Sequence, residues 1–261
     1  MTIQKNIVNL APTMNFFEHI GRYFMMLELV FTKPERSKVF WEDFFSEAVL
    51  IVINSIPLVA FLSFFMGGVT AIQSASSMES PLLPEYTIGY ITRQSTILEF
   101  SPTIISLIIA GKVGSNISSE IGTMKVTEQI DALEIMGVNS IGYLMLPKIL
   151  STTIFFPILI TISIVLSLIG GWFAGVTSGL YSTETYLLGV RYFWEVDQYS
   201  LYYALGKCMV FAFLITSIAS YFGYYTKGGA LEVGKASTTA VVVSSVAILL
   251  ANYVITQVIL I

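Results

Sequence analysis

Charge is scarce in this chain. Asp, Glu, Lys and Arg together make up 11% of its 261 residues, while hydrophobic residues make up 55%. Soluble domains average about 25% charged residues, so a chain with so few must meet a solvent other than water over most of its surface. The composition predicts an integral membrane protein, and the net charge of −4 gives no indication of a nucleic-acid partner.

The residues that usually build catalytic and metal centres are also nearly absent. The single cysteine, Cys208, excludes an internal disulfide bond and a cysteine metal cluster. The single histidine, His19, leaves no material for a histidine metal site or a Ser-His-Asp triad. The aspartates fall outside the uncharged runs, which argues against an intramembrane aspartyl protease. We therefore expect no enzyme activity, metal site or cofactor in this chain.

Long uncharged runs are what the chain does have. Four of them, 48–78, 149–183, 208–226 and 236–261, are each at least 19 residues long. A hydrocarbon core of roughly 30 Å needs about 20 helical residues, so each run can cross a membrane. A fifth run, 94–111, is apolar apart from Glu99, and one carboxyl does not prevent insertion. The sequence thus predicts an all-α membrane bundle of five spans, at about 48–76, 94–111, 149–177, 204–226 and 236–260.

The segment 1–47 has a different character from the single membrane domain expected at 48–261. Apolar residues recur in it at helical spacing beside charged ones: Phe16, Ile20, Tyr23 and Leu27 with Glu18, Arg22 and Glu28. Such a helix lies in the headgroup plane of the membrane or simply packs on the bundle, and the pattern leaves both open. No apolar core followed by a small-residue cleavage site is present, so we expect no cleaved signal peptide.

The basic residues are distributed unevenly between the loops. Ten of the 13 lie in 1–47, 112–148 and 224–236, and the other three are Arg93, Arg191 and Lys207. Because positive loops remain in the cytoplasm, the N-terminus and both basic loops are predicted there and the C-terminus outside. An odd number of spans agrees with this orientation.

The charged stretch between the second and third spans predicts a short amphipathic helix at about 117–136. Val126, Ile130 and Leu133 recur on one side of it. An acidic flank accompanies them: Glu120, Glu128, Asp131 and Glu134. The pattern fits a solvated loop helix resting on the membrane, and it also fits a helix that a partner outside the membrane grips.

One stretch imitates a nucleotide site. Residues 229–237, GALEVGKAS, nearly fit the phosphate-loop pattern G-x-x-x-x-G-K-[ST], but Ala236 stands where a Mg²⁺-binding hydroxyl is needed. A true phosphate loop also follows a buried strand, whereas this stretch lies between two spans. We therefore expect no ATP binding by this chain.

Three segments resemble the MlaE family, the permease subunits of lipid-transporting ABC systems associated with MCE proteins. They are AGKVGSNISSEIGTMKVTEQIDALEIMGVN (110–139), GYYTKGGALEVGKASTTAVVVSSVAILLANYVIT (223–256) and LEFSPTIISLIIAGKVGS (98–115). The resemblance implies that the helix at 117–136 seats in a groove of a separate cytoplasmic ATPase subunit. Six residues match the motif positions: Glu120, Gly122, Met124, Glu128, Gln129 and Glu134. With Asp131 of the acidic flank they form the predicted ATPase-coupling set.

Glu99 is the other candidate site residue, because an ionisable group within a span is by default functional. The resembling family has Glu here, often preceded by Arg, where this chain has Leu98, and Ser101 stands where Gly is usual. Glu99 is therefore expected to be protonated or to pair with Arg93. A role in a lipid path and a role in helix packing both remain open.

Five spans without an internal repeat are too few to enclose a wide path, so a homodimer is the economical assembly. The apolar spans suit an amphiphile better than an ion or a sugar. The resemblance implies a bacterial inner-membrane permease that moves phospholipids or related lipids to or from a periplasmic MCE-domain partner. The alternative is a secondary transporter or channel for an amphiphile that needs no ATPase.

Overall fold

The computed structural model describes residues 17–31, 37–77 and 84–260, and within these ranges the chain is helical without strands. Five helical stretches are long and apolar enough to cross a membrane: Lys38–Ser77, Tyr86–Val126, Ser140–Thr177, Tyr199–Tyr224 and Ala230–Ile259. This confirms the all-α class and the five predicted spans.

The first span consists of α2 (Ser37–Ile51), the short η1 (Ile53–Ser55) and α3 (Ile56–Ser77). The second is a continuous run of α4 (Tyr86–Ser95), η2 (Thr96–Ile104), α5 (Ile105–Ile109), η3 (Ala110–Gly114) and α6 (Ser115–Val126), in which η2 and η3 are π-helical. The remaining helices are α7 (Gln129–Ile135), α8 (Ser140–Thr177), α9 (Thr183–Arg191), α10 (Trp194–Tyr224) and α11 (Ala230–Leu260).

The spans are longer than the uncharged runs that predicted them. The second extends beyond 94–111 at both ends, and the third begins at Ser140 instead of 149. The boundary expected between 47 and 48 lies inside α2. An uncharged run marks only the part of a helix that lipid can accept, while the helix itself continues until a cap or a turn ends it.

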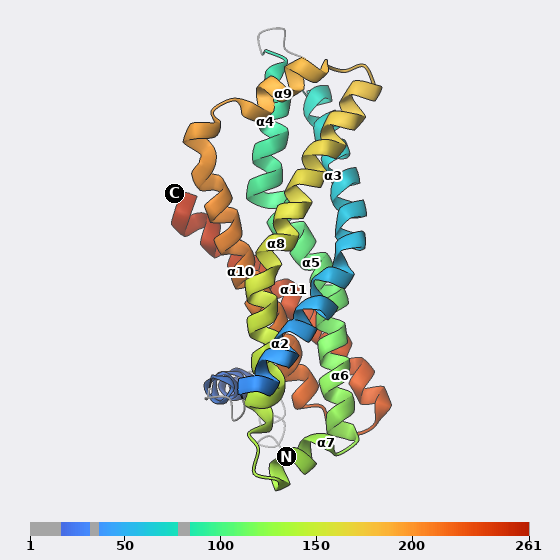
Figure 1. Cartoon of the computed structure of the whole chain (residues 1–261), viewed down its shortest axis with the longest axis vertical. Coiled ribbons are helices and arrows are strands. Elements are labelled where there is room, and N and C mark those ends of the chain that lie inside the picture. The colour runs from blue at the N-terminus through green and yellow to red at the C-terminus, as the bar shows by residue number, and fades with distance from the viewer. Residues whose placement is uncertain (1–16, 32–36, 78–83, 261) are drawn as a thin grey trace, which may run out of the picture.

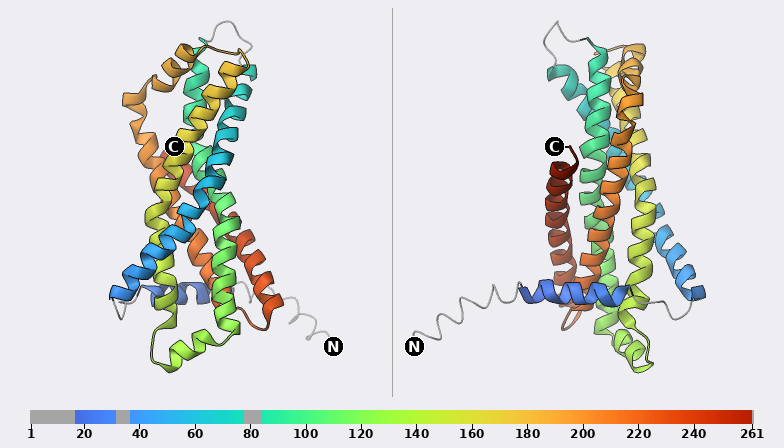
Figure 2. Two further views of the ribbon diagram at one scale, coloured as in Figure 1. Left: turned by 45° about the vertical axis from the view of Figure 1, so that its right-hand side comes forward. Right: turned by 90° about the vertical axis from the view of Figure 1, so that its left-hand side faces the viewer.

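The long helices run side by side along the molecule (Figures 1 and 2). One end of the bundle is formed by α7 and the other by α9, here named the α7 end and the α9 end. Near the α7 end, the helix at residues 17–30 lies across the bundle (Figure 2). Its Met26 and Val30 are fully buried, while Phe17, Phe24 and Met25 on other sides are 72%, 63% and 58% exposed. The helix predicted in segment 1–47 therefore packs on the bundle and also presents an apolar surface outward; Phe16 of that prediction is outside the described residues.

Small residues allow the first and third spans to approach closely. A Cβ on Gly67 of α3 would lie 1.8 Å from the Ser167 carbonyl oxygen of α8, and one on Gly170 would lie 1.9 Å from that of Phe64. Such backbone contact is possible only without a side chain. A chain of buried serines crosses the same contact, because Ser63 donates to Ser163 at 2.8 Å and Ser163 donates to Ser101 at 3.0 Å.

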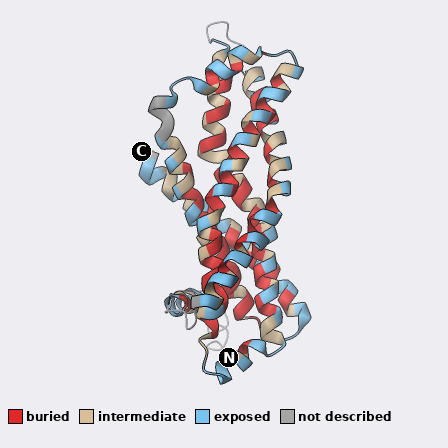
Figure 3. Cartoon of the chain, viewed as in Figure 1, coloured by how far each residue is buried: buried red, intermediate tan, exposed pale blue. Residues whose placement is uncertain are grey.

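The last span has the most open surface. Only 17% of its most apolar 18-residue window is buried within the chain, compared with 56% for the second span. Figure 3 shows exposed and partly exposed residues over most of the segment that leads to the C-terminus. A surface this apolar needs lipid or another protein against it.

Candidate functional site

The segment expected to be one helix at 117–136 is two helices joined by a sharp turn. α6 continues from the second span to Val126, and α7 begins at Gln129. Between them Glu128 has φ 61, the left-handed region, and after α7 Gly137 has φ 79. A non-glycine residue in that region costs about 1–2 kcal/mol, so its neighbours must hold this turn in place.

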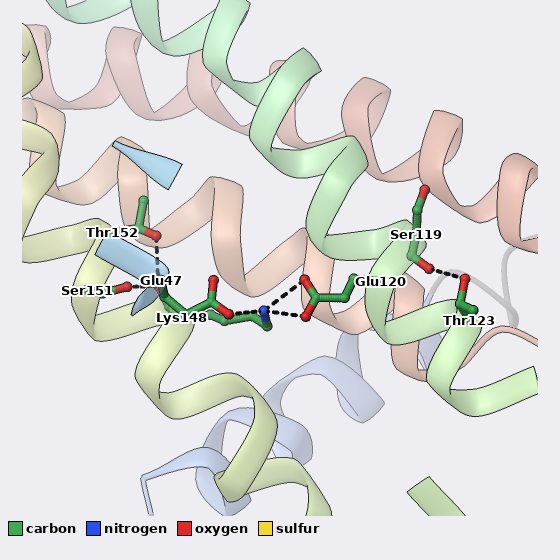
Figure 4. A network of polar contacts seen from close by, with 7 residues as sticks. All are labelled: Glu47, Ser119, Glu120, Thr123, Lys148, Ser151 and Thr152. Carbon is green, nitrogen blue, oxygen red and sulfur yellow. Dashed lines mark hydrogen bonds and ion pairs between the residues drawn. The ribbon is translucent and has the colours of Figure 1, made fainter. Parts of the chain in front are cut away.

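Glu120, a member of the predicted coupling set, contacts an internal lysine. Lys148 of α8 is 3% exposed, and its Nζ lies 2.9 Å from both carboxylate oxygens of Glu120 on α6. The same Nζ also contacts the Glu47 carboxylate of α2 (Figure 4). One buried ammonium thus ties three helices together, although the sequence interpretation had counted Lys148 as a loop residue.

Two other acids of the predicted acidic flank, Asp131 and Glu134, also have partners within the chain. Asp131 of α7 pairs with Lys125 of α6 at 2.5 Å. Glu134 accepts hydrogen bonds from Tyr224 of α10 at 2.8 Å and from Ser140 of α8 at 2.9 Å. Each contact joins α7 to a different helix, so α7 is held against the ends of α6, α8 and α10.

Gly122 and Met124 also point inward. A Cβ on Gly122 would lie 3.2 Å from Val233 of α11, a contact tighter than is normal, and Met124 is half-buried against the core. Both residues therefore serve the packing of α6.

Four members of the predicted set are exposed: Glu120, Glu128, Gln129 and Glu134. Of these, Glu128 and Gln129 make no side-chain hydrogen bond or ion pair within the described part of the chain. Two apolar residues at the other end of α7 were missed by the coupling prediction: Ile135 is 88% exposed and Met136 is 69% exposed. The sequence did contain a signal for their exposure. Ile130 and Leu133 form the inward face of the helix, and Ile135 and Met136 do not continue that spacing and directly precede Gly137. These four residues, Glu128, Gln129, Ile135 and Met136, are named the α7 surface.

Glu99 has a different partner from the one expected. Its Oε1 accepts from Lys207 of α10 at 2.8 Å, whereas Arg93 donates to the carbonyls of Val190 and Tyr192 at 2.8 and 2.9 Å. The pairing with Arg93 is therefore wrong. Lys207 is buried in its span. The sequence analysis counted it only among the three basic residues outside the basic loops, because 108 positions separate it from Glu99.

The Glu99 carboxylate also lies beside the last span. Its Oε2 accepts from Asn252 of α11 at 3.1 Å and from Thr103 at 3.2 Å. The side chain of Glu99 is 41% exposed, while that of Lys207 is 0% exposed. The pair therefore presents its acidic member outward and keeps its basic member inside, within the apolar middle of the bundle.

The chain is similar to known membrane proteins over most of its length. The family model described as permease MlaE matches residues 44–258. A probable ABC transporter permease protein of Rickettsia bellii is 37% identical over 246 residues, which cover 94% of this chain and 93% of the relative. Another from Rickettsia typhi is 35% identical over 255 residues, 97% of each chain. The chloroplastic protein trigalactosyldiacylglycerol 1 of Arabidopsis thaliana is 27% identical over 227 residues, 85% of this chain and 63% of the relative.

Proposed function

Because this chain belongs to the MlaE permease family, we propose that this membrane permease subunit of an ABC transporter moves phospholipids or related lipids. A separate ATPase subunit drives the movement, and the lipid passes between the bacterial inner membrane and a periplasmic MCE-domain partner. The N-terminus and the α7 end face the cytoplasm and the C-terminus faces the periplasm, as the distribution of basic loops favours.

The observation that carries ATPase coupling is the exposure of the α7 surface. Ile135 and Met136 are apolar and 88% and 69% exposed, and the exposed Glu128 stands at the other end of the same short helix. An apolar pair with a charge on the same helix at the end of a bundle is the composition of a small protein-docking surface. It suits insertion into a groove of a partner at that end.

The contacts behind the α7 surface support the transmission of movement. Asp131, Glu134 and Glu120 connect this end to α6, α8, α10 and, through Lys148, to α2. A displacement of α7 therefore moves the ends of several spans together. Nucleotide-driven closure of the ATPase then selects one arrangement of the spans over another.

A lipid substrate is supported by the surroundings of Glu99. Its partly exposed carboxylate, with Asn252 of α11 beside it, gives a polar group at the edge of an otherwise apolar bundle. An amphiphile with a headgroup and acyl chains matches such a surface better than a hydrated ion does. The name of the Arabidopsis relative also contains that of a glycolipid.

A homodimer is supported by the open last span. Most of its apolar surface is not covered by the described part of the chain, and a second copy of the chain doubles the number of spans around a two-fold axis. The first span, Glu99 and the last span then line a shared path.

Co-purification tests this function. We expect Glu128→Lys to release a bound ATPase subunit, since it reverses a charge on the α7 surface. Glu184→Lys makes the same reversal on an exposed acid of α9 at the other end of the bundle, and serves as the matched control. Normal assembly and lipid transport by Glu128→Lys would contradict ATPase coupling and favour the ATPase-independent transporter or channel.

A further inference from the structure

We propose that a cavity at the α7 end, separate from Glu99 and from the α7 surface, binds the phosphate group of an anionic membrane lipid. The cavity is bounded by the helix at 17–30, the end of α10 and the beginning of α11, and is named the α10–α11 cavity. Its volume is about 510 Å³, enough for a phosphate and its neighbouring headgroup atoms. The site does not depend on which molecule the permease transports.

Three basic side chains from the three segments line the α10–α11 cavity: Arg22, Lys227 and Lys235. Two carboxylates line it as well. Glu18 pairs with Arg22, and Glu232 pairs with Lys235 at 2.6 Å. The lining therefore has one positive charge in excess when His19 is neutral.

Lys227 supplies that excess charge. It is exposed in the turn after α10 and makes no ion pair or hydrogen bond within the described part of the chain. Arg22 and Lys235 each donate one hydrogen bond to a carboxylate, and a guanidinium has five donors and an ammonium three. Donors therefore remain from three directions for one anionic group, which is the pattern that phosphate recognition requires.

The walls of the α10–α11 cavity are held in place by polar contacts. The Nδ1 of His19 lies 2.6 Å from the Tyr221 hydroxyl, and the two rings meet edge to face. One turn further along, the hydroxyls of Tyr23 and Ser217 lie 2.8 Å apart. These contacts fix the helix at 17–30 against α10. The position of the cavity wall is therefore set by the packing of two helices. Burial raises the pKa of Tyr23, so its phenol remains protonated at neutral pH.

The depth of the α10–α11 cavity favours a lipid as the source of the phosphate. The helix at 17–30 lies across the bundle (Figure 2) and exposes Phe17, Phe24 and Met25. A helix that lies across the spans with aromatic residues outward is typical of the headgroup region. Basic pockets between helices at that depth bind the headgroups of anionic lipids.

A nucleotide does not fit the same residues. Lys235 belongs to the GALEVGKAS stretch, but α11 begins at Ala230 and takes Gly234 and Lys235 into a regular helix. The backbone N–H groups of Glu232 and Val233 donate to the Gly229 carbonyl, and those of Gly234 and Lys235 lie within the helix, so they are not available to cradle a phosphate. The cavity can therefore recognise a phosphate group only through its side chains, Arg22, Lys227 and Lys235.

Native mass spectrometry of the full-length protein from nanodiscs tests the proposal. We expect wild type to retain phosphatidylglycerol in preference to phosphatidylcholine, and Lys227→Gln and Lys235→Gln each to lower that preference about fivefold, the size of one basic contact with an anionic lipid. Lys38→Gln removes an exposed lysine at the start of α2, outside the cavity, and should leave the preference unchanged.

Three outcomes overturn the proposal. Equal retention by wild type and Lys227→Gln would show that the cavity is not the site. An equal loss in Lys38→Gln would reduce the effect to general surface charge. Competition by inorganic phosphate in detergent, as effective as by phosphatidylglycerol, would show a free-anion site and not a lipid site. Lys227→Gln breaks no contact of the fold, so its result does not depend on the stability of the variant.

Discussion

Lys207 of α10 donates a 3.0 Å hydrogen bond to the carbonyl of Leu98, the residue four positions before Pro102. In a regular helix the N–H of residue 102 would serve that carbonyl, and proline has none. The same ammonium forms the ion pair with Glu99 at 2.8 Å. The buried Lys207 thus supports the π-helical part of the second span, η2, and orients the Glu99 carboxylate.

This relationship predicts a rescue. Lys207→Met should lower the free energy of unfolding by about 3 kcal/mol, because it removes the positive partner of the Glu99 carboxylate and the Lys207 hydrogen bond to the Leu98 carbonyl. The loss should be smaller when Pro102→Ala restores the backbone N–H. Thermal unfolding in detergent of the two single variants and the double variant measures the coupling. Strict additivity of the two changes would contradict it.

Glu99→Ala should weaken lipid transport more than it weakens assembly. The carboxylate is 41% exposed and lies next to α11, so it is placed to meet a substrate and not only to pack helices. Lipid transfer in reconstituted vesicles and recovery of the complex are measured together. Glu85→Ala removes an exposed acid just before α4 and is the control. Unchanged transport by Glu99→Ala would leave Glu99 with a structural role only.

Ile135→Asp should reduce retention of the ATPase subunit at least tenfold while leaving the fold intact. The side chain is 88% exposed, so a charge there costs the isolated chain little, yet it would have to be desolvated inside a partner groove. Size-exclusion chromatography of the complex measures retention, and the unfolding temperature of the subunit alone checks the fold. A complex that survives the substitution would show that the partner does not enclose this residue.

Lys148→Met should destabilise the α7 end. It removes the only partner that the described residues show for both Glu47 and Glu120, whose side chains are 15% and 44% exposed. Breaking a buried pair costs about 3–5 kcal/mol, and the partial exposure of Glu120 places the expected loss near the lower limit. Lys38→Met, at a lysine 89% exposed, should change stability by less than about 0.5 kcal/mol. Comparable unfolding temperatures for the two variants would contradict the role of Lys148.

Gly170→Ala should lower the free energy of unfolding by at least about 3 kcal/mol, the upper end of the usual cost of overpacking. The new methyl would lie 1.9 Å from a backbone oxygen of α3. Gly206→Ala in α10 meets nothing within 4 Å and should stabilise the helix by about 0.5–1 kcal/mol. Opposite shifts in the unfolding temperature are therefore expected from the same chemical change.

The contacts of the acidic residues around α7 could not be predicted from the sequence. The acids around α7 share a helical period, and that pattern alone does not distinguish an outward from an inward carboxylate. Glu120 and Glu134 stay exposed and still accept hydrogen bonds from Lys148 and Tyr224, residues of other helices. Ile135 and Met136 face outward because α7 ends beside them.

The amino-acid sequence by itself determined the all-α membrane class, the five spans and the membership of a permease family. These follow from scarcity of charge, from apolar length and from local motifs, all of which are properties of short segments. Only the tertiary structure decided that Lys207 and not Arg93 meets Glu99, that Lys148 joins three helices, and that the helix at 17–30 closes a basic cavity. The reason is physical: the partner of a buried charge is set by which helices pack together, and that packing joins residues more than 100 positions apart.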